Sequence, residues 1–164
     1  MHRLGAVRVK AQTSIGVISD THGLVRPEAV AALRGSDLIM HAGDVGHPAV
    51  LETLGAVAPV VAVRGNNDRG PWAERLPATK VLEVAGITLC LLHDVADLDV
   101  DPEAAGYQAV IAGHSHQPKL ERRGGVLYLN PGSAGPRRFK LPVSLARIRL
   151  HAKRIEAELV ELEV

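Results

Sequence analysis

Short apolar runs separated by polar turns recur along the chain, and their order in the first half predicts alternating strands and helices. Residues 13–19, 37–41 and 59–63 are short runs rich in Val, Ile and Leu, which suits buried strands. Residues 27–34 and 48–54 lie between them, and each begins with a proline, which is favoured in the first turn of a helix. This order predicts parallel strands joined by helical crossovers.

The second half of the chain shows a different pattern. The apolar runs 80–84 and 87–92 flank Ala85-Gly86, which suits a tight hairpin. One helix is expected near 102–107, and the remaining expected strands are 109–112, 126–129, 143–150 and 155–162. We therefore expect one α/β domain over residues 13–164, after an N-terminal extension of residues 1–12. It should hold a largely parallel sheet and a second, more antiparallel one.

Composition narrows the classes of function. Aromatic residues make up 2% of the 164-residue chain and the formal net charge is +1, which argues against stacking on single strands and against non-specific nucleic-acid binding. The single cysteine, Cys90, excludes an internal disulfide and a cysteine-cluster zinc site, and its apolar surroundings predict a core residue. The longest apolar run, 56–63, is far shorter than the about 18 residues of a membrane span. No signal-peptide pattern is present, so we expect a cytoplasmic protein without membrane partners.

Side chains able to bind metals follow five of the predicted strands, each at the carboxyl end, where ligands bind in open α/β sheets. They are Asp20, His22, Asp44, Asn66, His93, His114 and His116. This mixture of carboxylate, amide and imidazole groups suits Mn²⁺, Fe²⁺, Zn²⁺ or Ni²⁺ better than Ca²⁺. Seven ligands are too many for one catalytic ion with an open position. They suit two ions bridged by a carboxylate, an arrangement that clamps a phosphoryl group.

The motifs in this order resemble those of the calcineurin-like metallophosphoesterases. They are Asp20-x-His22, Gly43-Asp44, Gly65-Asn66-x-Asp68, His93 and Gly113-His114-x-His116. The short chain, the opening Ile18-Ser19-Asp20-Thr21-His22-Gly23 and the later Asn130-Pro131-Gly132-Ser133 are similar to the small branch of YfcE-type phosphodiesterases.

The resemblance implies a four-layer αββα sandwich, with two mixed β-sheets flanked by helices, and a phosphodiesterase with two divalent metal ions. Mn²⁺ is the usual ion, with Ni²⁺, Fe²⁺ and Zn²⁺ as alternatives. One ion would be held by Asp20, His22 and His116 and the other by Asn66, His93 and His114, with Asp44 between them. A hydroxide between the ions would attack phosphorus. Small relatives are often homodimers or homotetramers.

Two positions depart from the family pattern. Asn67 stands where larger members have a histidine that contacts the substrate, and Asp94 stands where glycine is common. The amide of Asn67 can donate a hydrogen bond to a phosphate oxygen but cannot act as an acid at neutral pH. We therefore assign Asp44, Asn66 and Asn67 to catalysis and expect slow cleavage that favours acidic phenolic leaving groups.

Other polar residues receive weaker assignments. His47 and Arg137 are candidate substrate contacts, and Arg138 shares that interpretation with Arg137. His41, on the second predicted strand, is expected to be buried and hydrogen-bonded, with a supporting role at the metal site as the alternative.

Two other functions remain open at this point. The same fold serves as a protein-binding scaffold in the retromer's phosphoesterase-like subunit, and a phosphomonoesterase would differ only in its substrate. Cyclic nucleotides, other small phosphodiesters and phosphorylated metabolites are all candidate substrates.

Overall fold

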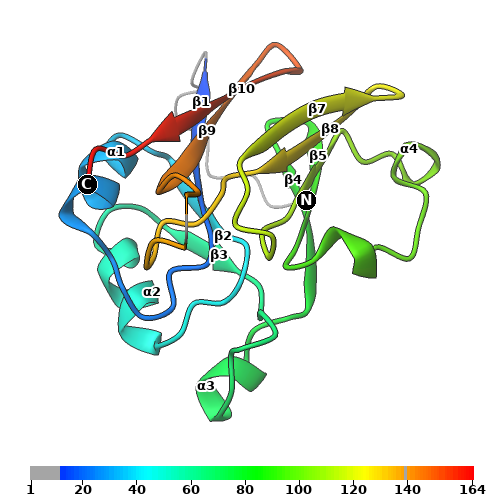
Figure 1. Cartoon of the computed structure of the whole chain (residues 1–164). Helices are drawn as coiled ribbons and strands as arrows, with labels where there is room; N and C mark the ends of the chain where they lie inside the picture. The colour runs from blue at the N-terminus through cyan, green and yellow to red at the C-terminus, as the bar shows by residue number, and fades with distance from the viewer. Residues whose placement is uncertain (1–11, 139) are drawn as a thin grey trace.

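The computed structural model describes residues 12–138 and 140–164, so the predicted extension lies almost wholly outside the described residues. Two five-stranded sheets pack face to face (Figure 1). Their facing sides enclose a wholly aliphatic core, in which Ile15, Met40 and Ile148 of one sheet meet Leu89 and Ile111 of the other. The expected α/β sandwich of two mixed sheets is confirmed.

The first sheet has the strand order β10-β9-β1-β2-β3. Its strands are β1 (Thr13–Ile18), β2 (Leu38–His41), β3 (Val60–Ala62), β9 (Ser144–His151) and β10 (Arg154–Glu161). The strands β1, β2 and β3 run parallel, as the crossover pattern predicts, and β9 and β10 are antiparallel additions.

The second sheet has the order β4-β5-β6-β8-β7. Its strands are β4 (Thr79–Val84), β5 (Ile87–Leu92), β6 (Ala109–Ile111), β7 (Lys119–Arg123) and β8 (Val126–Asn130). In this sheet the three inner strands β5, β6 and β8 run parallel, and the edge strands β4 and β7 run antiparallel to their neighbours. The predicted hairpin is present, with Ala85 and Gly86 both at positive φ.

Three expectations need correction. The two sheets do not divide into a parallel and an antiparallel one, because β9 returns to pair with β1 and makes the first sheet mixed as well. Two elements were not expected from the sequence. One is β7, a strand of mostly charged residues at a sheet edge. The other is α3 (Pro71–Glu74), a single helical turn that buries Ala73.

The outer faces of the sheets are covered unequally (Figure 1). The helices α1 (Pro27–Leu33) and α2 (Pro48–Gly55) cover the first sheet and bury Leu33 and Leu54 against it. The second sheet carries a smaller apolar cluster around Cys90, beside the single turns η1 (Val95–Asp97) and α4 (Pro102–Ala105). Among the described residues, no helix is long and apolar enough to cross a membrane.

Candidate metal centre

The loops that follow β1, β2, β3, β5 and β6 meet at one edge of the sandwich. Backbone hydrogen bonds join them: Asp20 N–H donates to Gly43 O, and Gly113 N–H donates to His93 O. The second bond joins two loops of the second sheet, and the first joins two loops of the first. The parallel strands of both sheets thus direct all seven predicted ligands to one edge of the sandwich.

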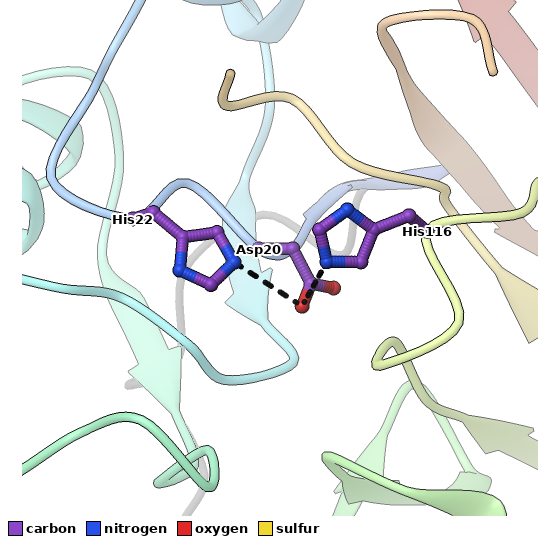
Figure 2. A group of neighbouring side chains, drawn as sticks. All are labelled: Asp20, His22 and His116. Atoms are coloured by element: carbon purple, nitrogen blue, oxygen red, sulfur yellow. Dashed lines mark ion pairs between the residues drawn. The ribbon is translucent and has the colours of Figure 1, made fainter. Parts of the chain in front are cut away.

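Asp20, His22 and His116 form one part of this cluster, called here the His116 side (Figure 2). Oδ1 of Asp20 lies 3.3 Å from Nε2 of His116 and 3.9 Å from Nε2 of His22. Both imidazoles therefore approach the same carboxylate oxygen. Asp20 is fully buried, and the side chain of His116 is 6% exposed.

Asn66, His93 and His114 form the other part, called here the His114 side. Nδ1 of His114 lies 3.2 Å from Oδ1 of Asn66 and 3.4 Å from Nε2 of His93. Nδ1 of His93 donates to the carbonyl oxygen of Ala42 at 2.8 Å, which leaves Nε2 facing the cluster and free to bind a cation. The side chain of His114 is 47% exposed, so this side opens to solvent.

Asp44 lies between the two sides. Its Oδ2 is 3.7 Å from Nε2 of His22 and 3.3 Å from Nε2 of His93. Oδ1 of Asp20 also approaches Nε2 of His93, at 3.9 Å, and Asp20, Asp44 and His93 place ligand atoms within 4.8 Å of one another. The two carboxylates therefore connect the imidazoles of His22, His93 and His116, and the ring of His114 joins the cluster through Nε2 of His93.

Unpartnered buried atoms test whether the cluster fits metal ions. In the described part of the chain, four buried side-chain nitrogen or oxygen atoms have no hydrogen-bond partner, and three of them belong to the His116 side. They are Oδ1 of Asp20, Nε2 of His22 and Nδ1 of His116. Leaving such atoms unsatisfied costs about 1–3 kcal/mol each, so an ion bound by Oδ1 of Asp20 and Nε2 of His22 would be stabilising. Two of them face each other across 3.9 Å, and this donor set fits a divalent transition metal ion.

The backbone of the ligand loops is strained. Among the described residues, eight non-glycine residues have positive φ, and five of them are predicted ligands. These five are Asp20, His22, Asp44, His114 and His116, with φ between 47° and 72°. The left-handed region is unfavourable for residues with a Cβ, and strain of this kind concentrates at functional sites. The sharp turn it allows directs each side chain back across the sheet edge.

The loops are held by residues that the sequence analysis did not assign to the site. Asp68 accepts hydrogen bonds from three backbone N–H groups, those of Val45, Gly46 and Gly65, and so joins the loops after β2 and β3. Ser19 donates to Oδ2 of Asp20 at 2.6 Å. The position of Asp68 within the Gly65-Asn66-x-Asp68 motif was the available signal.

Two further supports lie on the second sheet. Oδ2 of Asp94 is 3.6 Å from Nε2 of His114, so this departure from the family pattern helps to orient a predicted ligand. Nδ2 of Asn130, at the end of β8, donates to the carbonyl oxygen of Gly113 and to Oγ of Ser115, and so fixes the loop between the two histidines. Only the structure shows the pairing of Asp94 with His114.

His41 is buried and hydrogen-bonded, as expected, and it joins two ligand loops. Its Nδ1 accepts from the N–H of Gly43, so Nε2 carries the proton and donates to Oγ1 of Thr21, which in turn donates to the carbonyl oxygen of Val45. Burial, reinforced by the nearby charge of His93, lowers the pKa of His41 to about 3. His41 is therefore a neutral positioning residue.

The acid–base properties of the cluster reflect its pairing. Burial opposes ionisation of Asp44, yet hydrogen bonds from His93 and Asn67 hold its pKa well below the ordinary value. Burial likewise works against a charged His93, but the hydrogen bond to Asp44 raises its pKa overall. At His116 burial prevails, and with the charge of Arg138 it lowers the pKa. Asp44 is thus a carboxylate anion, and His116 favours the neutral form that binds metals.

Asn67 contacts Asp44 instead of pointing freely into solvent. Its backbone N–H donates to Oδ1 of Asp44 at 2.9 Å, and its side-chain Nδ2 donates to Oδ2 at 3.0 Å. The amide thus holds both oxygens of the carboxylate that lies between the two sides. The structure thus shows a positioning contact for Asn67, and its contact with substrate stays a prediction.

The two candidate substrate contacts, His47 and Arg137, form hydrogen bonds with the protein backbone. Nδ1 of His47 accepts from the N–H of Ala49 and caps α2. Nη2 of Arg137 donates to the carbonyl oxygen of Val164 at the C-terminus. Of the two arginines considered together, Arg138 is the one whose charge acts on His116. Cys90 is buried in the core, as expected.

Comparison with known proteins decides the family. The model of the calcineurin-like phosphoesterase superfamily domain matches residues 14–153, which include every predicted ligand. The chain belongs to the calcineurin-like phosphoesterase superfamily. A probable metallophosphoesterase of Methanothermobacter thermautotrophicus is 36% identical over 158 residues, which cover 89% of this chain and 91% of that relative. The resemblance read from the motifs is confirmed.

Solved structures show that this calcineurin-like fold is shared with both enzymes and a sorting protein. An archaeal phosphodiesterase matches with a TM-score of 0.73 and 21% identity, covering 90% of this chain and all of the other. The phosphoesterase YfcE from E. coli gives 0.65 and 24%, covering 92% and 100%. Vacuolar Protein Sorting 29 from Cryptosporidium parvum gives 0.75 and 17%, covering 94% and 100%. At these identities the matches show the fold alone.

Proposed function

We propose that this phosphoesterase-family chain hydrolyses small phosphodiesters and requires two divalent metal ions, with Mn²⁺ as the preferred one. The observation that carries the proposal is the convergence of two carboxylates, four imidazoles and one amide at one sheet edge, with buried polar atoms left unpartnered there. A protein that only binds other proteins has no need of such a cluster, and leaving these atoms unpaired would only destabilise it.

Each residue has a role in this proposal. Asp20, His22 and His116 hold one ion, Asn66, His93 and His114 hold the other, and Asp44 contributes to both. Metal ions bound there would supply an activated water nucleophile and neutralise the phosphoryl oxygens. Ser19 orients Asp20, and Asn67 orients Asp44, through the hydrogen bonds described above.

The position of Asn67 favours esters whose leaving group needs no proton. An amide is not an acid at neutral pH, and the Nδ2 of Asn67 already donates to Asp44. We expect p-nitrophenyl esters to be cleaved much faster than alkyl esters in the chemical step. Equal single-turnover rates for bis-p-nitrophenyl phosphate and a dialkyl phosphate would contradict this expectation.

The test of the function is metal-dependent hydrolysis of bis-p-nitrophenyl phosphate by the wild type, Asp44→Asn and the matched control Asp99→Asn. Asp99 is an exposed residue outside the cluster. We expect turnover that requires Mn²⁺ or a similar ion and falls about a thousandfold in Asp44→Asn, which corresponds to about 4 kcal/mol, while Asp99→Asn stays within twofold of the wild type. No turnover by the wild type with Mn²⁺, Ni²⁺, Fe²⁺ or Zn²⁺ would favour a scaffold, and preference for p-nitrophenyl phosphate would indicate a monoesterase.

A further inference from the structure

A cavity of about 520 Å³ opens beside the His114 side, on the outer face of the second sheet. His114 lines it, as does Asn130, which fixes the His114 loop, so the cavity borders the candidate metal centre at His114. Its lining includes the apolar side chains of Val110 on β6 and Leu129 on β8, together with Lys119, Arg123 and Tyr128. Among the described helices, η1 and α4 lie on this face, and each is a single turn that leaves part of the sheet accessible.

The size and lining of the cavity indicate the kind of group it takes. Its volume lies within the range of about 300–1,000 Å³ typical of small-molecule sites, and a methyl or ethyl ester would leave most of it empty. Apolar lining residues together with polar ones suit a flat ring that carries hydrogen-bonding atoms.

Two of the lining residues, Arg123 and Tyr128, form a cation–π pair. The guanidinium carbon of Arg123 lies 4.1 Å from the centroid of the Tyr128 ring, so the cation covers an aromatic face. A further flat ring can stack against this pair. Glu121 forms ion pairs with Lys119 at 3.1 Å and with Arg123 at 3.7 Å, so these three alternate residues of β7 carry two cations and one anion. That balance suits a neutral ring with polar edges better than a highly charged group.

The scarcity of aromatic residues limits the ligand further. Among the described residues, Tyr128 is the only aromatic one other than histidine that lines the cavity, and the chain has two tyrosines, one tryptophan and one phenylalanine in all. One ring stacks one base, whereas proteins that bind single-stranded nucleic acid stack successive bases on several rings. The cavity therefore fits one nucleoside and not a polynucleotide.

We propose that this cavity binds one ester group of the phosphodiester substrate and that this group is a nucleoside, whose base stacks on the Arg123–Tyr128 pair. The inference rests on the proposed phosphodiesterase function. It makes Arg123 and Tyr128 specificity-determining residues and adds a substrate class, the nucleoside monophosphate diesters.

Two substrates with the same leaving group test the proposal: the p-nitrophenyl ester of thymidine 5′-monophosphate and methyl p-nitrophenyl phosphate. We expect Arg123→Ala and Tyr128→Ala to lower kcat/KM for the thymidine ester about tenfold and to leave the methyl ester within twofold. The control Arg149→Ala removes an exposed arginine on β9 of the other sheet and should change neither. Equal losses on both esters, or no loss on either, would overturn the proposal.

A binding measurement separates the cavity from the reaction. In saturation-transfer NMR on the metal-free protein, thymidine 5′-monophosphate should receive its strongest saturation at the base protons, and Arg123→Ala and Tyr128→Ala should abolish it. If neither ester is hydrolysed but this signal appears and responds to the variants, the subsite stands and the proposed function fails. If both esters are hydrolysed alike and no base signal appears, the function stands and the subsite is wrong.

Discussion

The two sides of the candidate metal centre differ in exposure and in what contacts their polar atoms. On the His116 side the carboxylate and one imidazole are almost fully buried, and three atoms have no protein partner. On the His114 side the protein supplies partners: Asn66 and Asp94 contact His114, and the carbonyl oxygen of Ala42 holds His93. Asp44, between them, is held by Asn67.

This difference teaches that the two sides have different tolerance for change. Water can reach the exposed His114 side and replace a missing ligand there. The buried carboxylate of the His116 side is less accessible to such a substitute, and a cation would satisfy its unpartnered Oδ1 together with Nε2 of His22. We therefore expect the buried side to bind its metal ion more selectively and to depend more strongly on each ligand.

The largest expected effect comes from two single variants, each of which removes one imidazole from one side of the centre. His116→Ala should lower kcat/KM for bis-p-nitrophenyl phosphate about a thousandfold, and His114→Ala about a hundredfold, because a water molecule can take the place of the exposed ring. Steady-state kinetics at saturating Mn²⁺, with metal content measured on the same samples, checks this. The reverse order would break the comparison.

Substituting glycines that pack against the ligand loops has the next largest expected effect, a loss of stability. A Cβ on Gly65 would overlap the backbone nitrogen of Asp44, whereas a Cβ on Gly113 would meet Oγ of Ser19 and Oδ2 of Asp20, which are side-chain atoms. Backbone cannot move aside as a side chain can, so Gly65→Ala should cost about 3 kcal/mol of unfolding free energy and Gly113→Ala about 1–2.

Urea denaturation of the metal-free protein measures both changes. Gly55→Ala is the matched control, because a Cβ there meets nothing within 4 Å at the end of α2, and it should be neutral or stabilise by up to about 1 kcal/mol. If Gly65→Ala matched this control, the loops after β2 and β3 would not be packed as described.

His41 tests whether the two ligand loops of the first sheet depend on a neutral imidazole. Burial lowers its pKa to about 3 in the folded protein from about 6.5 for a solvated histidine, so between these pH values the unfolded chain binds the extra proton. Stability should therefore fall as the pH drops from 6.5 toward 3, by about 1.4 kcal/mol per pH unit from this one group.

The variant His41→Gln removes this titration. Denaturation with EDTA present at several pH values between 4 and 7 should show a shallower pH dependence in the variant than in the wild type. Parallel curves would mean that His41 does not remain neutral on folding.

The smallest effect is expected at Asn67. Asn67→Ala removes the side-chain hydrogen bond to Asp44 but keeps the backbone one, so kcat/KM should fall about five- to tenfold, as expected for one hydrogen bond to a charged acceptor. Metal content should not change. A loss as large as that of Asp44→Asn would instead indicate that Asn67 contacts the reacting phosphate.

The location of the site could be predicted from the sequence because topology decides it. A β-α-β-α-β order makes strands parallel, and parallel strands bring their carboxyl ends to one edge, so the Asp20 and Asp44 loops had to meet. The spacing of the motifs supplied the remaining ligands. Family membership then followed from the same residues.

Contacts between distant segments could not be predicted in this way. The pairing of β9 with β1 joins residues more than a hundred positions apart, and no local pattern in either strand states its partner. Strand β7 has the sequence KLERR, which is polar because one face of this edge strand meets solvent. The contact between Asp94 and His114 depends on how two loops approach and not on either loop alone.

The left-handed backbone at five predicted ligands has an evolutionary consequence. Glycine adopts this conformation without the penalty of roughly 1 kcal/mol that other residues incur, so each of these positions trades stability for a side chain. A descendant that no longer needed metal would lose this penalty by replacing a position such as His22, whose Nε2 has no hydrogen-bond partner, with glycine. Selection for folding would favour that change. Several such replacements would have to be reversed together to restore the centre, so its loss in this fold would be difficult to reverse.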